Sequence, residues 1–244
     1  MQCLLVADLH ANLAAFRAVL DAASGHEEIW CLGDLVGYGP DPNECIEVLR
    51  EYRHVAVAGN HDWAAVGRVP LGNFNVTARA AVEWTAANLR PENARYLHSL
   101  PTQEQRGEFT LVHGSLRSPI WEYVDESGAA WANLKRQQTR YCLVGHTHVP
   151  ALFLEMSGLI RRAQAVPLRG ELVKLSLGES KAILNPGSVG QPRDGDDRAA
   201  FALLDTDTGA VELHRVEYPV AETQNRILEA GLPERNAFRL GLGR

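Results

Sequence analysis

Two histidines, His146 and His148, follow a short apolar run in the sequence YCLVGHTH, with a single threonine between them. If residues 141–144 form a buried strand, side chains two positions apart project from the same face, and the two imidazoles leave the strand end side by side. They can then reach one shared target. Taken alone, the motif also fits two ordinary surface or hydrogen-bonded histidines, so other polar residues must converge before it indicates a site.

Polar residues of the same kinds stand at the carboxyl ends of the preceding apolar runs. These runs predict buried strands at residues 3–7, 29–32, 55–58, 110–112 and 141–144. The side chains that follow them are Asp8, His10, Asp34, Asn60, His61, His113, His146 and His148. Because ligands of α/β sheets bind beyond the carboxyl ends of the strands, we expect the five loops to converge on one site. A turn or capping role explains some of these residues singly but not the whole set.

The residue types indicate metal chemistry. Carboxylates, an amide oxygen and neutral imidazoles without a thiolate suit Mn, Fe, Zn, Co or Ni, and we expect Mn²⁺ first. The candidate ligands exceed the needs of one tetrahedral ion: Asp8, His10, Asp34, Asn60, His113, His146 and His148. Two divalent metal ions are the natural solution, with Asp34 as the carboxylate best placed to bridge them.

The elements that must position these residues alternate along the chain. Apolar residues recur at three- and four-residue intervals in residues 12–23, 41–52 and 75–89, which predicts amphipathic helices between the strands and an α/β class. After His148 the segments become shorter and alternate in polarity. They predict a mostly antiparallel sheet, with a β-hairpin around the DTDTG of residues 205–209. The tail from Ala221 is expected to be helical.

Composition sets the outer limits of the function. The 244 residues carry a net charge of -6, and we expect one domain over residues 1–244 with no extended nucleic-acid surface. No apolar run approaches the ~18 residues that span a bilayer, and no signal peptide is evident, so no membrane role is expected. The four cysteines lack a Cys-x-x-Cys spacing. These features predict a reduced, cytoplasmic protein. The oligomeric state stays open, and an exposed edge strand would allow a homodimer.

The motifs also occur in a familiar order. Asp8-x-His10, Gly33-Asp34-x-x-Gly37, Gly59-Asn60-His61-Asp62, His113-Gly114 and Gly145-His146-x-His148 resemble the calcineurin-like metallophosphoesterase superfamily, in particular its small single-domain bacterial and archaeal phosphodiesterases. The segment NPGSVGQPRDG, residues 185–195, looks like the closing strand and loop of that branch. Ala7 and Ala11 depart from the small hydroxyl residue and the glycine that relatives place there, but neither departure removes a ligand.

The resemblance implies a four-layer α/β/β/α sandwich with mixed sheets and a dinuclear metal site at one end. It implies that one ion is held by Asp8, His10, Asp34 and His148, and the other by Asp34, Asn60, His113 and His146. His61 is then the histidine left over, and we expect it to be the general acid that protonates the leaving group. Asp62 would orient His61 or, alternatively, cap a turn or helix. Asn60 and Arg193 are expected to contact the substrate phosphate, although Arg193 also fits an ordinary surface arginine.

The leading hypothesis is a dinuclear metal-dependent phosphoesterase that hydrolyses small phosphate esters by attack of metal-activated hydroxide. Phosphodiesters are the favoured substrates, and these include nucleotides. A non-catalytic protein-binding scaffold of the same fold is one alternative, and a serine/threonine protein phosphatase is another. The retention of His61 together with all seven ligands favours catalysis over the scaffold. Residues 63–101 and 115–138 carry Phe74, Trp84, Trp121, Tyr123 and Trp131, which either wall a pocket or belong to the core.

Overall fold

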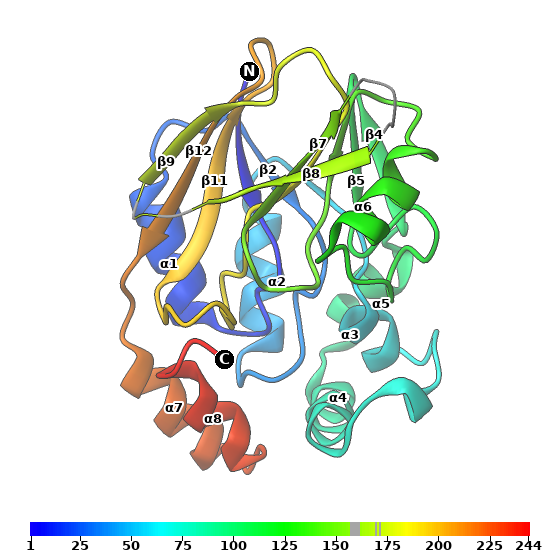
Figure 1. Ribbon diagram of the computed structural model, residues 1–244. Coiled ribbons are helices and arrows are strands. Elements are labelled where there is room, and N and C mark those ends of the chain that lie inside the picture. The colour runs from blue at the N-terminus through cyan, green and yellow to red at the C-terminus, as the bar shows by residue number, and fades with distance from the viewer. Residues whose placement is uncertain (157–161, 169, 171) are drawn as a thin grey trace.

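Two six-stranded mixed sheets pack face to face (Figure 1) in the computed structural model, which describes residues 1–156, 162–168, 170 and 172–244. The first sheet has the strand order β3-β2-β1-β11-β12-β9. Its strands are β1 (Gln2–Val6), β2 (Glu28–Cys31), β3 (His54–Ala56), β9 (Leu172–Ser176), β11 (Ala199–Asp205) and β12 (Ala210–Val216). The second has the order β4-β5-β6-β10-β7-β8. Its strands are β4 (Gln103–Arg106), β5 (Phe109–Val112), β6 (Tyr141–Leu143), β7 (Ala151–Met156), β8 (Arg162–Val166) and β10 (Ala182–Asn185).

Side chains alternate between the two faces of a strand, and both faces of β1 are apolar, so the core has more than one layer. In β1, Leu4 and Val6 face the helices outside the first sheet, while Cys3 and Leu5 face the second sheet. Every apolar residue of β1 is fully buried. A strand covered on both faces reads as a continuous apolar run, and this is why the sequence signal for β1 is so clear.

Helices cover the outer faces of both sheets and one end of the molecule. They are α1 (Leu13–Ala22), α2 (Pro42–Arg50), α3 (Asn60–Ala65), the 3₁₀ turn η1 (Leu71–Asn73), α4 (Val76–Asn88), α5 (Pro91–Ser99), α6 (Ser127–Leu134), α7 (Val220–Glu229) and α8 (Glu234–Leu240). The core cluster outside the first sheet includes residues of α1, α2 and α5, and the one outside the second sheet includes residues of α6. Figure 1 shows α4, α7 and α8 at the lower end of the sheets. The four-layer α/β/β/α architecture is confirmed.

The predicted hairpin is confirmed, because β11 and β12 pair antiparallel with Asp205 opposite Ala210. The prediction of one antiparallel sheet for the second half is wrong. Strands β9, β11 and β12 extend the first sheet, whereas β7, β8 and β10 extend the second. Strand β10 lies parallel to β6 and antiparallel to β7, so each sheet is mixed. The helical tail is also divided into α7 and α8 around Gly231, which adopts a positive φ of 69°.

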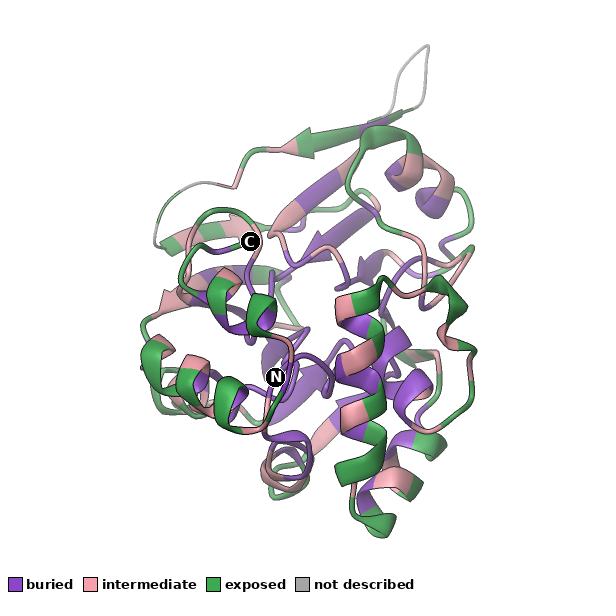
Figure 2. Cartoon of the chain, turned by 90° about the horizontal axis from the view of Figure 1, so that it is seen from below, coloured by how far each residue is buried: buried purple, intermediate pink, exposed green. Residues whose placement is uncertain are grey.

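Burial is concentrated where the loops meet. Figure 2, seen from the lower end, shows a buried centre of strands and loops surrounded by the exposed outer faces of the helices. Among the described residues, no helix has the length and apolar character that crossing a membrane requires. That one domain spans residues 1–244 stays a prediction.

Candidate metal centre and active site

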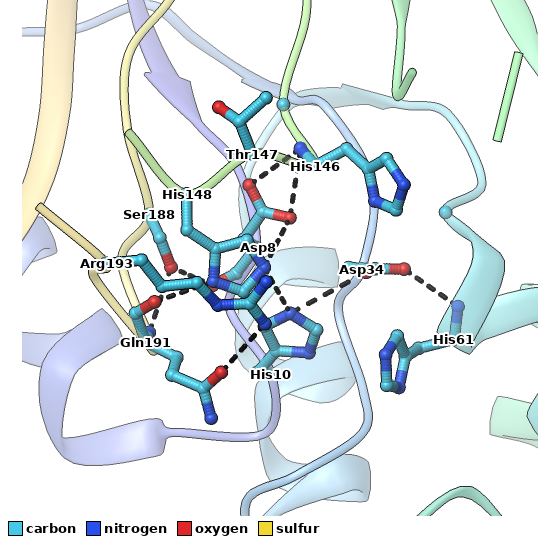
Figure 3. A network of polar contacts seen from close by, with 12 residues as sticks. Asp8, His10, Asp34, His61, His146, Thr147, His148, Ser188, Gln191 and Arg193 are labelled. Atoms are coloured by element: carbon cyan, nitrogen blue, oxygen red, sulfur yellow. Dashed lines mark hydrogen bonds and ion pairs between the residues drawn. The ribbon is translucent and has the colours of Figure 1, made fainter. Parts of the chain in front are cut away.

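The structure brings the seven predicted ligands together at the loop ends of the two sheets. Each is less than a tenth exposed: Asp8, His10, Asp34, Asn60, His113, His146 and His148. Their ligand atoms form compact groups, in which the donor atoms of Asp8, His10 and His148, and those of Asp34, His113 and His146, lie within 4.8 Å of one another. Loops that are far apart in the sequence therefore supply one polar cluster, as the strand-end pattern predicted (Figure 3).

Asp34 stands between the two groups. Its Oδ2 lies 3.6 Å from His10 Nε2 and 3.4 Å from His113 Nε2, while its Oδ1 accepts a 2.9 Å hydrogen bond from the backbone N–H of His61. One oxygen thus faces imidazoles of both groups, and the other is held by the start of α3. This is the arrangement that a bridging carboxylate needs.

An unusual backbone conformation aims these side chains. Five of the seven predicted ligands have a positive φ: Asp8, His10, Asp34, His146 and His148, with values from 47° to 67°. Side chains other than glycine avoid this left-handed region at a cost of about 1–2 kcal/mol per residue. Such conformations persist where the surrounding structure imposes them, and they cluster at functional sites.

Gly37 and Gly59 leave space that the side chains of His61 and Asp34 occupy. A Cβ atom at Gly59 would lie 2.0 Å from Asp34 Oδ1, and one at Gly37 would lie 2.3 Å from the Nδ1 of His61. Gly37 also has a φ of 94°, which side chains rarely adopt. Both glycines of the GD and GNHD motifs are therefore required by the close approach of neighbouring groups.

Backbone carbonyls hold the imidazoles of His10 and His148 so that their nitrogen lone pairs point at each other. His10 Nδ1 lies 3.1 Å from the carbonyl oxygen of Val36, and His148 Nδ1 lies 2.6 Å from that of Gln191. A carbonyl only accepts, so each Nδ1 must carry the hydrogen and each neutral ring presents an Nε2 lone pair. Those two Nε2 atoms are 3.1 Å apart. Without a cation between them they would repel, and a metal ion bound by both removes that repulsion.

His113 and His146 are held by backbone carbonyls in the same way, except that His146 bonds through Nε2 instead of Nδ1. His113 donates from Nδ1 to the carbonyl of Leu32 at 2.8 Å, and His146 donates from Nε2 to the carbonyl of Trp121 at 3.2 Å. The remaining atoms, His113 Nε2 and His146 Nδ1, face each other at 3.1 Å. A cation between these two rings would remove their repulsion in this half as well.

Protonation distinguishes the two halves. Burial lowers the pKa of both His10 and His148 well below the usual histidine value, so a proton does not bridge the first pair at neutral pH. Burial also opposes the charged form of His113, but the carboxylate of Asp34 outweighs it and raises the pKa of His113 to about 9. A proton can therefore sit between His113 and His146. In the first half, where burial disfavours protonation of both rings, a bound metal ion would supply the positive charge.

Two further atoms fit a metal-loaded site. Asn60 Oδ1 and His61 Nδ1 are both buried without a hydrogen-bond partner among the described residues. An unpaired buried amide oxygen costs free energy unless something coordinates it, and this fits the prediction that Asn60 ligates the second ion. His61 also forms a compact group with His10 and Asp34, so its ring lies within reach of a metal ion as well as of a substrate.

The Asp62 carboxylate accepts hydrogen bonds from three backbone N–H groups, those of Asp34 at 2.8 Å, Gly59 at 2.9 Å and Val36 at 3.2 Å. Among the described residues it forms no hydrogen bond with Nδ1 of the His61 ring, and an orienting or charge-stabilising role stays a prediction. The capping alternative describes the contacts that are seen. The reason is that Asp62 lies in the first turn of α3, where its carboxylate reaches the free amides of its own helix start and of the neighbouring loop. It holds the Asp34 loop against α3.

A cleft of about 200 Å³ opens over the cluster. Asp34, Asn60, His61, His146, His148 and Arg193 line its polar side, and Tyr38, Phe74, Trp121 and Tyr123 line its aromatic side. Arg193 is half-buried and donates to Gln191 Oε1 at 2.9 Å, and Figure 3 places it beside His148 and His10. Of the five aromatic residues singled out from the sequence, Phe74, Trp121 and Tyr123 reach the cleft. Trp84 and Trp131 pack against hydrophobic clusters instead.

Sequence reasoning missed the residues that fix the ligands. The ring of Tyr38 lies 4.6 Å from that of His10 and 4.5 Å from that of His61, centroid to centroid. Ser188 donates to the carbonyl of Asp8 at 2.9 Å, and Asn185 donates to the carbonyl of Gly145 at 2.8 Å. The last two belong to the NPGSVGQPRDG segment, whose density of turn residues was the available signal. Tyr38 carried none beyond its place in a glycine-rich loop.

The fold and the site define a class: a two-sheet α/β protein whose loop ends are built to hold divalent metal ions. A sequence model of the calcineurin-like phosphoesterase superfamily domain matches residues 1–209, and this chain belongs to that superfamily. It is therefore a phosphoesterase of the hydrolase class. The family's divalent metals have fitting ligands here in the Asp and His groups described above.

Relatives cover the chain to different extents. An uncharacterized protein of Methanocaldococcus jannaschii is 35% identical over 98% of this chain and 97% of its own length. A symmetrical bis(5′-nucleosyl)-tetraphosphatase of Pseudomonas putida is 32% identical, over 48% of this chain and 42% of its own length. Among solved structures, a metallophosphoesterase from Sphaerobacter thermophilus has a TM-score of 0.89 and 46% identity, covering 100% of this chain and 99% of that one.

Proposed function

We propose that this protein hydrolyses phosphodiesters, nucleotides among them, with two divalent metal ions, of which Mn²⁺ is the first to test. The observation that carries the proposal is the pair of facing imidazole lone pairs, His10 with His148 and His113 with His146, on either side of the Asp34 carboxylate. Metal ions between the rings would make this arrangement favourable at both pairs, and burial disfavours the alternative of a proton between His10 and His148.

The protein's own groups orient and shield the reaction. Two bound divalent ions would lower the pKa of water and draw electron density from the phosphate oxygens. Asp8, His10, Asp34 and His148 would hold one ion, and Asp34, Asn60, His113 and His146 would hold the other. Backbone carbonyls fix each imidazole, so the ligand set is in place before metal arrives. Arg193 neutralises charge on the phosphate from the cleft side.

His61 donates the proton to the leaving alkoxide. It lines the cleft and its backbone is anchored to Asp34 Oδ1, so the ring faces the position where the ester would lie. Burial lowers the pKa of His61 to about 4 in the free protein. The negative charge of a phosphate ester in the cleft raises that pKa again, because a nearby opposite charge favours the imidazolium. Protonation of the acid is thus coupled to substrate binding.

The test uses bis-p-nitrophenyl phosphate and the monoester p-nitrophenyl phosphate on chelator-stripped protein, with and without added Mn²⁺. We expect Mn²⁺ to restore diester cleavage and to act less on the monoester. Two Mn²⁺ bound per chain by calorimetry would accompany the activity. A stripped protein that binds Mn²⁺ and cleaves neither ester would overturn the proposal, and faster monoester cleavage would replace the diesterase with a phosphatase.

A further inference from the structure

A second, strongly basic pocket adjoins the metal cleft. It has a volume of about 540 Å³ and is lined in part by three arginines, Arg193, Arg235 and Arg239. The same side chains of Tyr38, Asn75, Tyr123 and Arg193 line both spaces. The pocket is therefore a continuation of the cleft away from the metal ligands.

No acidic side chain neutralises these three arginines. Across the described part of the chain, no Asp or Glu carboxylate forms an ion pair with Arg193, Arg235 or Arg239, and the Nε of Arg193 is buried without a hydrogen-bond partner. Arg239 donates from Nε to the backbone oxygen of Arg244, which leaves its two terminal nitrogens for a ligand. Arg235 and Arg239 are also four residues apart on α8, a spacing at which like charges destabilise a helix. Three guanidinium charges around one pocket repel one another, and an anion bound between them would relieve that repulsion.

The helical pair α7–α8 holds the arginines firmly against the site. Asn236 donates from its side chain to the backbone carbonyl of Tyr38 at 3.5 Å, between the positions of the two arginines on α8. Arg226 of α7 forms an ion pair with the buried Asp41. The N–H of Gly195, two residues after Arg193, donates to the carbonyl of Gly243 at 2.9 Å. These contacts tie the C-terminal helices to the loops that carry Tyr38 and Arg193.

We infer that Arg235 and Arg239, with Arg193, form a binding subsite for a second phosphate group of the substrate, which makes a phosphate chain the preferred ligand. The inference rests on the proposed phosphoesterase function, because Arg193 joins the subsite to the cleft where the scissile phosphate would lie. Guanidinium groups bind phosphate oxygens through paired, charge-assisted hydrogen bonds. Arg193 lies within the residues 1–209 that the family model matches, and Arg235 and Arg239 lie beyond them.

The aromatic side of the cleft supports the same substrate class. Phe74 and Trp121 form an edge-to-face pair with centroids 5.4 Å apart, and Tyr123 stacks on His146 at 4.2 Å. A nucleoside can contact these rings while its phosphates extend over the metal ligands to the arginines. The combination fits a nucleoside polyphosphate or a dinucleoside polyphosphate better than an ester with a single phosphate.

The first experiment measures binding without turnover. Inorganic tripolyphosphate is titrated by calorimetry into chelator-stripped protein, the Arg235→Gln/Arg239→Gln variant, and a control variant Arg17→Gln/Arg95→Gln. The control removes the same charge from exposed positions on α1 and α5 that line neither space. We expect the α8 variant to bind at least about tenfold more weakly than wild type and the control to bind within about twofold. Equal weakening in both variants, or none in either, overturns the subsite.

The second experiment separates the subsite from the catalytic proposal. With Mn²⁺, we expect the α8 variant to show a raised KM for diadenosine tetraphosphate and an unchanged rate with bis-p-nitrophenyl phosphate. Parallel losses on both substrates would show a structural role for the arginines and overturn the inference. If wild type cleaves neither compound, the proposed function fails while the calorimetric result still decides the subsite. The single Arg235→Gln variant, at an exposed position, repeats both measurements if the double variant does not fold.

Discussion

The metal ligands differ from the mouth of the cleft, which is formed by Arg193, Arg235, Arg239 and Tyr123, in burial and in how firmly neighbouring groups hold them. The ligands are buried, their imidazoles are tied to backbone carbonyls, and most of them stand on strained backbone. At the mouth, Arg193 and Arg239 are half-buried, Arg235 is exposed, and Tyr123 is 46% exposed. The mouth is therefore more exposed than the ligand cluster, and no Asp or Glu side chain pairs with its three arginines among the described residues.

This difference separates the reaction from the choice of substrate. The ligand cluster leaves little freedom, because the imidazoles of His10, His113 and His148 bond to carbonyls of fully buried residues. The mouth is assembled from η1, the loop before α6, the loop after β10 and α8, and its side chains can change without disturbing the sheets. We expect substitutions in the cluster to abolish activity or metal binding and substitutions at the mouth to change substrate preference.

The sharpest test of the rigid cluster is Gly59→Ala. The added Cβ would meet Asp34 Oδ1 at 2.0 Å and the Asp34 amide nitrogen at 2.5 Å, so the bridging carboxylate must move. We expect metal-dependent activity to be lost and the free energy of unfolding to fall by about 1–3 kcal/mol, the usual cost of overpacking. Gly128→Ala is the control, because its nearest contact is an ordinary 3.5 Å. Activity retained in Gly59→Ala would contradict the account of a rigid cluster.

His61→Gln tests the boundary between cluster and mouth. A general acid is worth roughly 10²–10⁴ in kcat, so the role proposed for His61 predicts a loss of that size with the predicted metal ligands still in place. We expect two bound metal ions per chain and a larger loss of kcat with phenyl than with p-nitrophenyl leaving groups, since the poorer leaving group depends more on protonation. The exposed His98→Gln change serves as the control. Loss of a metal ion would instead identify His61 as a ligand.

Proton release distinguishes the two halves of the cluster. The pKa of His113 is raised to about 9 in the metal-free protein, so a metal ion in that half must displace a proton below that pH. In the other half, Asp8 has its pKa raised to about 7 by burial and is largely ionised at pH 8. We expect one ion to release close to one proton at pH 8 and the other far less. The apparent affinity of the His113 half for its metal ion should rise about tenfold per pH unit between pH 7 and pH 8, because binding there displaces a proton.

Calorimetry in two buffers of different ionisation enthalpy measures these proton numbers. Identical proton release for both ions at pH 8 would contradict the assignment of the proton to His113. Above pH 9 the difference between the two sites should vanish, because His113 is then neutral without metal.

Trp121→Leu should have the smallest effect. The side chain lines the cleft, while the carbonyl of the same residue, which accepts from His146, stays in place. Loss of aromatic contact should raise KM for a nucleoside ester about threefold to tenfold and leave KM for glycerol-based diesters unchanged. Trp131→Leu, which alters a side chain packed outside the second sheet, should change stability and not KM. Equal KM changes for both esters would remove the aromatic side of the cleft from substrate recognition.

Sequence reasoning reached the cluster because its information is local. An apolar run followed directly by Asp or His reports both a strand and what its carboxyl end presents, and Asp8, Asp34 and His113 were found in this way. The separation of the later strands into two sheets could not be found, because β10 pairs with β6 and β7 through contacts that no local pattern encodes. The capping alternative for Asp62 covered its local contact with Gly59, but not its contacts with Asp34 and Val36, which are distant in the sequence. Nothing in the sequence relates Arg239 to Arg193.

The left-handed residues have a consequence for how this chain would evolve. Asp8, His10, Asp34, His146 and His148 hold conformations that glycine adopts freely, so a glycine there relieves strain while it removes a ligand. Stability and catalysis are therefore opposed at these positions. In a lineage released from selection for catalysis, these sites should drift first and in one direction, toward glycine and asparagine, while the buried apolar residues of β1 stay under selection for folding.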